Sequence, residues 1–482
     1  MFNVLTSGKL RLWCLQIPFP KVPPIIVAGK AIAEGNKAED LLIHLRVIVY
    51  GLLEKGIRVI SYAADGTEVE RRLQRLLTAE ADSKRTYTFS HPGRANAGGT
   101  FSFTIPVFGN QPIAMVQDSK HALKTGRNQL LSGAHLGILG NYPLFYTQIR
   151  HLAVSKTGPL YNRDVEKLDR QDDNAATRLF CSDTLKWLTK HHDDQRGLIT
   201  YLFIIGEAID AYQNRYISHG ERIKMLLRAM FFMEGWEEFV LKARYKNSKH
   251  FISREYRDIL QILVSGFIQL IIIHRDLLDD VYAFLPWLHS TEVCEHLFGI
   301  MRSILMDFTM LDSMYMMPKL LIRIREHVLN ATSPTSKARA SGYNHTHADC
   351  GGIDLPMLSI FPSDEEINEF AIQAFEEAQN LLAITGIIPS TARSRNPLPN
   401  ISSWFSGDDC GAPGGEADIL ETIHDLDDHG HTSDGEVNES AEKTFDCAEN
   451  GACEGLPDSA VEQVEGLGYA AIMSSVRDSM HV

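Results

Sequence analysis

The sequence predicts an α/β unit, then a large helical block, then an acidic tail. Before about residue 131, short β-rich segments alternate with segments of helical periodicity, which is typical of α/β folds. From 132 to 284 the apolar residues recur almost entirely at helical spacing. From 389 onward the chain is rich in Gly, Asp, Glu and Ser and poor in aromatic residues, so we expect a disordered tail.

The α/β unit opens with two β-rich segments that a Pro-rich stretch separates. A helix with Leu and Val at helical spacing follows and ends at Gly56. The compact apolar segment after it runs into Asp65 and Gly66. We expect strands over 10–16, 24–28, 57–62, 86–90, 100–106 and 112–116, and helices over 38–53, 67–79 and 119–131.

The helical block contains four long amphipathic stretches. The most apolar run, Ile259–Ile273, is shorter than the ~20 residues that span a bilayer, and Gln261, Ser265 and Gln269 interrupt it. It therefore predicts a buried helix and no membrane segment. We expect helices over 177–188, 198–212, 221–241 and 256–273, and further helices over 292–308 and 364–384.

Length, charge and cysteine content indicate a soluble protein of two or three units. A chain of 482 residues with 44% hydrophobic residues is long enough for two or three units with a sizeable core. Residues 401–482 hold 19 acidic and two basic residues and so carry −17, whereas the other 400 residues carry +3. The acidity of the chain, net −14, therefore belongs to the tail. Seven scattered cysteines and the lack of an apolar leader favour a soluble intracellular protein.

Asp65 is the first candidate site residue. It follows an apolar strand, and open α/β sheets bind ligands at the carboxyl ends of their strands. Gly66 beside it allows a sharp turn of the backbone. The alternative is that Asp65 only caps the helix that begins near Thr67.

Glu295 is the second candidate. On a helix, Glu295, Gly299 and Arg302 share one face, and the neighbouring residues are mostly apolar. A half-buried carboxylate requires a partner or a metal ion. The alternative is an ion pair with Arg302 or with a basic residue elsewhere.

A basic stripe is the third candidate. It follows Asp118 on the expected helix 119–131 and suits contacts with phosphate groups of a nucleic acid or a nucleotide. The alternative is a solvated helix face. The stripe consists of Lys120, Lys124 and Arg127, with His121 and Asn128 close by. The chain contains no P-loop, GxGxxG, GxSxG or HExxH motif.

Three blocks resemble the transposase family that includes P-element-type enzymes and their THAP-domain relatives. Gly56–Arg71 is similar to the family's strand-Asp-Gly-helix block, and Gln117–Leu131 to its Asp-x-x-His-x-x-Lys-x-x-Arg-Asn block. His289–Arg302 resembles the block with the last acidic residue, which is also similar to hAT transposases. In this order the blocks cover about two thirds of the chain.

The resemblance implies an RNase H-like core interrupted by a helical insertion. The core would comprise 1–131, the insertion 132–284, and the helix block with the last acidic residue 285–330; a linker with one helix (331–388) and the tail (389–482) follow. Members cut and join DNA with two divalent ions held by three acidic side chains. The resemblance thus implies Asp65 and Glu295 as catalytic ligands of Mg²⁺ or Mn²⁺. It implies DNA or nucleotide contacts for Asp118, Lys120, His121, Lys124, Arg127, Asn128 and Arg302.

The family's first acidic residue precedes the segment equivalent to Leu10, where this chain has nine residues without Asp or Glu. We therefore expect an N-terminally truncated core whose DNA cleavage and strand transfer are impaired. The resemblance also implies a nuclear protein with DNA as its partner, and leaves a homo-oligomer and a bound nucleotide open. One alternative is a domesticated, non-catalytic DNA- or protein-binding regulator on the same fold. Another is a helical scaffold whose acidic tail recruits basic partners.

Overall fold

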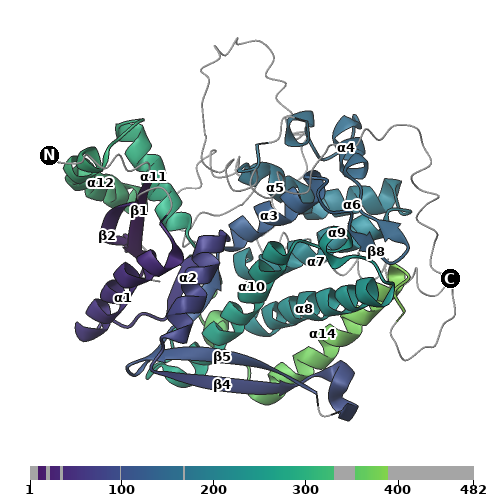
Figure 1. The fold of residues 1–482 in the computed structure, drawn as a ribbon, viewed down its shortest axis with the longest axis horizontal. Coiled ribbons are helices and arrows are strands. Elements are labelled where there is room, and N and C mark those ends of the chain that lie inside the picture. The colour runs from purple at the N-terminus through teal and green to yellow at the C-terminus, as the bar shows by residue number, and fades with distance from the viewer. Residues whose placement is uncertain are drawn as a thin grey trace, which may run out of the picture. The chain divides into compact units, whose positions relative to one another are not determined.

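The computed structural model describes residues 9–17, 22–32, 36–97, 99–166, 169–330 and 353–388, which belong to one compact unit, Met1–Arg395. In these residues the protein is mixed α/β, with small sheets and many helices (Figure 1). The predicted acidic tail and the predicted linker up to residue 352 lie outside the described residues.

The first elements form a hairpin and a helix pair. Strands β1 (Lys9–Leu15) and β2 (Ile25–Ile32) pair antiparallel. Helices α1 (Ala38–Glu54) and α2 (Glu68–Ala79) pack together, because each buries one apolar stripe in a shared cluster. Arg11 of β1 forms an ion pair with Glu70 of α2 and so ties the hairpin to the helices.

Two parallel strands follow, and they position the candidate site. β3 (Ser61–Ala64) pairs with β7 (Ala114–Gln117) in the register Ser61 to Ala114. β3 begins later than the predicted strand over 57–62, because its only ladder partner among the described residues begins at Ala114. Both strands end at the same edge, so the residues that follow them are neighbours.

A second hairpin lies between β3 and β7 in the sequence. β4 (Ser83–Ser90) pairs antiparallel with β5 (Thr100–Phe108), which also pairs with β6 (Gln111–Pro112). The side chain of Gln269 bonds the carbonyl of Thr104 at 3.1 Å and the N–H of Met115 at 3.3 Å. Gln269 interrupts the apolar run in the sequence and lies in helix α10 (Arg254–Ile272). It therefore joins α10 to both β5 and β7.

The remaining structure is helical apart from the short pair β8 (Ile138–Leu139) and β9 (Tyr142–Pro143). Helices α7, α8 and α10 are buried along most of their length, and α14 packs against α8. The helices are α3 (Ser119–Leu131), α4 (Tyr146–Val154), α5 (Asp173–Phe180), α6 (Ser182–His191), α7 (Arg196–Gln213), α8 (His219–Lys242), α9 (Asn247–His250), α10 (Arg254–Ile272), α11 (Glu292–Ile304), α12 (Met310–Asn330) and α14 (Asp364–Ile384).

The predicted helix over 177–188 is two helices. Cys181 adopts an extended backbone between α5 and α6. The carbonyl of Arg178 accepts hydrogen bonds from the Thr184 hydroxyl (2.5 Å) and the Cys181 thiol (3.1 Å). These side chains take the place of backbone donors and end α5 there.

The predicted buried helix is confirmed in α10. Arg254–Leu277 is the one stretch of the described residues that is long and apolar enough to cross a membrane, and it is mostly buried inside the protein. Its Gly266 lies directly on β7, with no room for a side chain. The helix is a central support of the parallel strand pair.

We expect Gly266→Ala to lower the free energy of unfolding by about 1–3 kcal/mol, the usual cost of overpacking a core. Its Cβ would lie 2.5 Å from the carbonyl oxygen of Met115 and 3.2 Å from Cα of Val116, both backbone atoms. The matched control is Gly299→Ala in α11, where a Cβ has no atom within 4 Å. That control should be neutral or stabilising by up to about 1 kcal/mol, because alanine favours helices. Chemical denaturation of both variants measures the difference, and equal effects would contradict the close packing.

Candidate acidic site

Two aspartates follow the ends of the parallel strands. Asp65 comes directly after β3, and Asp118 directly after β7. The backbone N–H of Asp118 donates to the carbonyl of Ala64 at 3.0 Å, so the two aspartates stand on neighbouring strands. We had predicted the strand-end position of Asp65, and the structure places Asp118 beside it at the end of the neighbouring strand.

Asp118 is buried and fully hydrogen-bonded. Its Oδ1 accepts bonds from the N–H groups of Lys120 (2.8 Å) and His121 (3.1 Å), so it caps α3. Its Oδ2 accepts bonds from the N–H and the hydroxyl of Thr291, both at 2.7 Å. Thr291 is the residue before α11, so one carboxylate joins the starts of two helices that lie 173 residues apart.

Asp65 is half-buried and bonds its own loop. Its Oδ1 accepts from the N–H of Thr67 at 3.1 Å and from the Thr67 hydroxyl at 2.9 Å. Thr67 in turn caps α2 by accepting from the N–H of Glu70. The N-cap of α2 is thus Thr67, and Asp65 supports this capping residue instead of capping the helix itself.

Glu295 reaches across to α3. Its Oε1 lies 2.6 Å from Nε2 of His121 and 3.9 Å from Nζ of Lys124. Its ion-pair partners are thus on α3, whereas Arg302 is exposed on α11. The hydrogen bond from His121 holds the pKa of Glu295 below its ordinary value, although burial opposes this. Burial lowers the pKa of His121, but the bond to Glu295 and the negative charges of Asp118 and Glu295 together outweigh burial and raise that pKa overall.

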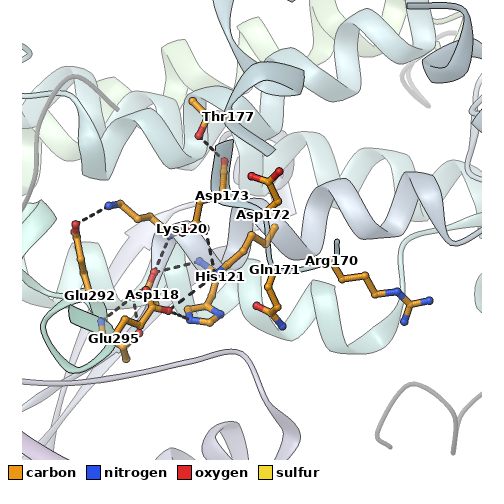
Figure 2. A network of polar contacts seen from close by, with 12 residues as sticks. Asp118, Lys120, His121, Arg170, Gln171, Asp172, Asp173, Thr177, Glu292 and Glu295 are labelled. Carbon is orange, nitrogen blue, oxygen red and sulfur yellow. Dashed lines mark hydrogen bonds and ion pairs between the residues drawn. The ribbon is translucent and has the colours of Figure 1, made fainter. Parts of the chain in front are cut away.

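Two more carboxylates complete the network. Lys120 pairs with Glu292 at 2.8 Å, and Lys124 pairs with Asp173 at 3.2 Å. Figure 2 shows Asp118, His121 and Glu295 converging, with Lys120 directed to Glu292. Burial raises the pKa of Asp173, and the charge of Lys124 opposes this shift. The network alternates basic side chains of α3 with acidic side chains of α5 and α11.

Arg127 and Asn128 hold a loop instead of an anion. The buried guanidinium of Arg127 donates to the carbonyls of Asp164, Asp169 and Asp172, at 3.1 to 3.2 Å. The Asn128 amide donates to the carbonyl of Arg170 at 3.3 Å. Both residues fix the segment before α5, which carries Asp173.

The predicted basic stripe is therefore neither a solvated face nor a set of free cations. Lys120, Lys124 and Arg127 are all less than a tenth exposed. We had not predicted Glu292, Asp173 and Thr291 as site residues. Glu292 lies three residues before Glu295 and is detectable by helical spacing, whereas no local pattern marks Asp173.

The carboxylates of the site are of a chemical type that binds divalent metal ions, but their arrangement does not form a closed set of ligands. Carboxylate oxygens are the ligands that Mg²⁺ and Mn²⁺ prefer. Asp118, however, has its lone pairs occupied by four hydrogen bonds. Across the described ranges no three His, Cys, Asp or Glu side chains gather closely enough to hold a metal ion. The role of Asp65 and Glu295 as metal ligands stays a prediction from the resemblance.

No protein-family model, no curated protein and no solved structure matches the chain.

We expect Asp118→Ala to destabilise the protein by about 2–4 kcal/mol, because it removes a helix cap and the charged link to Thr291. The control is Asp172→Ala, which removes a cap with a single bond, to Ala175 of α5, and should cost about 1 kcal/mol. Denaturant unfolding of both variants measures this. Equal losses would mean that the link to α11 contributes nothing.

The His121–Glu295 pair should make stability depend on pH. Because the folded pKa of His121 is raised, its contribution is fully present below the unfolded value of about 6.5 and is lost as the pH rises through the folded pKa. His121→Gln should therefore destabilise the protein at pH 6 and less so at pH 8 to 9. Exposed His151→Gln is the control and should show no such trend. A difference between wild type and His121→Gln that does not change with pH would contradict the pairing.

Proposed function

We propose that the protein is derived from a DNA transposase, with an RNase H-like core that processes DNA at reduced efficiency through Asp65 and Glu295. One observation carries this proposal: residues from all three blocks of the resemblance meet at one sheet edge. Asp118 bonds the strand end next to Asp65, and it also bonds Thr291, whose carbonyl accepts the N–H of Glu295 at 3.2 Å.

The accessibility of the two candidate ligands supports the same proposal. Glu295 has 42% of its side chain exposed, and Asp65 is half-buried, so both are within reach of a ligand from solvent. Mg²⁺ or Mn²⁺, when bound, would supply Lewis-acid stabilisation of phosphodiester oxygens. The protein's own part is to hold Asp65 in the loop after β3 and Glu295 on the rigid start of α11. His121 and Lys124 would neutralise Glu295 while no metal ion is bound.

A second function has its own support. Lys120, Lys124 and Arg127 are buried and engaged with protein groups, so none is free for a phosphate in this arrangement. Asp118 is also fully engaged. These contacts favour a non-catalytic DNA- or protein-binding regulator, in which the acidic network only joins α3, α5 and α11.

A calorimetric titration with Mn²⁺ separates the two functions. We expect the full-length protein to show a binding phase that Asp65→Asn and Glu295→Gln each weaken at least tenfold. Glu238→Gln, an exposed carboxylate on α8, is the matched control and should leave this phase intact. The acidic tail is the same in every variant, so any Mn²⁺ that it binds cancels in the comparison.

A further variant tests the competition between protein cations and metal. Lys124→Met removes one cation beside Glu295 and should strengthen the Mn²⁺ phase, provided that circular dichroism shows the variant to be folded. If all five proteins bind Mn²⁺ alike, Asp65 and Glu295 are not ligands, and the regulator is the better reading.

A further inference from the structure

Two cysteines that are distant in the sequence meet where β1 packs on α11. Cys14 lies near the end of β1, and Cys294 lies in the first turn of α11. The strand and the helix are side by side (Figure 1). Cys14 packs against the apolar cluster that includes Val293, Leu297 and Met301, so its side chain faces α11.

The thiols of Cys14 and Cys294 also affect each other. Each thiol is near enough to shift the pKa of the other: Cys294, together with burial, raises the pKa of Cys14, and Cys14 lowers the pKa of Cys294. Both cysteines are free and half-buried. Partial exposure admits a small oxidant, while the apolar cluster holds the Cys14 side chain against the start of α11. Cys181, another reduced cysteine, instead donates its thiol to a backbone carbonyl three residues earlier.

The backbone at Cys14 is irregular. The register of β1 against β2 shifts between Trp13 and Cys14, as in a β-bulge. A bulge redirects a side chain and interrupts the regular ladder, so Cys14 can approach its partner without moving the whole strand. A disulfide needs the sulfur atoms to close to about 2.05 Å, and the packing of Cys14 against α11 places its thiol on the helix that carries Cys294.

We propose that Cys14 and Cys294 are a modification site, at which a hydroperoxide forms a reversible intramolecular disulfide. One thiolate attacks the peroxide oxygen, gives a sulfenic acid and releases water (or the alcohol of an organic peroxide). The second thiol then attacks the sulfenic sulfur and releases water as the S–S bond forms. The two thiols lose two electrons, and the peroxide is reduced.

The bond would tether the hairpin to the helix of the acidic site. Cys294 lies between Glu292 and Glu295, the two residues of α11 that pair with Lys120 and His121 of α3. Oxidation would fix the start of α11 on the β1 side in addition to its Asp118 link. Reduction by a dithiol would release it.

The test is differential alkylation of the folded full-length protein before and after hydrogen peroxide, followed by peptide mass spectrometry without reduction. We expect one cross-linked peptide that joins Cys14 to Cys294, lighter by two hydrogens than the sum of its parts. We also expect alkylation of these two cysteines to be lost and then restored by dithiothreitol. Cys181 should remain alkylated throughout.

Cys181→Ser is the matched control and should form the same cross-link. Cys14→Ser should abolish it and leave Cys294 alkylated or glutathionylated instead. The proposal is overturned if wild type keeps both thiols at peroxide concentrations that oxidise free glutathione. It is equally overturned if either cysteine pairs with a different one. Because these readouts use wild type, a variant that fails to fold does not decide the outcome.

Discussion

The buried carboxylate of Asp118 is the contact on which the other features of the site depend. It caps α3, receives both donors of Thr291 before α11, and stands beside the strand end that leads to Asp65. A charge with 1% exposure is tolerated because four donors replace its water. The position of α3 then sets His121 and Lys124 opposite Glu295. Removing this single group leaves the donors of two helices unsatisfied.

The sequence predicted secondary structure that depends on neighbouring residues. It did not predict which distant residues would pack against a given helix face. The helix over 364–384 and the buried helix within 256–273 follow from periodicity. Asp65 and Asp118 could be placed at strand ends, because short apolar runs precede both. The basic stripe could not be interpreted in this way. Helical spacing puts Lys120 and Lys124 on one face, but the carboxylates that cover that face come from Asp173 and Glu292, far along the chain.

Residues that interrupt the apolar run of α10 have structural roles that hydropathy does not indicate. Gln269 weakens the hydropathy of its helix, yet it bonds the backbones of β5 and β7. Gly266, one turn earlier, lets the same helix lie directly on β7. Through these two residues, α10 contacts β5 and β7 by hydrogen bonds as well as by close packing. Arg127 is a similar case, because its buried guanidinium donates hydrogen bonds to backbone carbonyls of the loop before α5.

The pairing of early with late segments also sets an order for biosynthesis. The packing of β1 on α11 and the bonds between Asp118 and Thr291 form only after α11 has been synthesised, and a ribosome produces Thr291 173 residues after Asp118. Helix α14 then packs on α8 and β4, so the last described helix closes contacts with a much earlier hairpin. Contacts of such long sequence separation slow folding and expose apolar surface in the meantime. The α/β unit therefore completes these contacts late, although it is synthesised first.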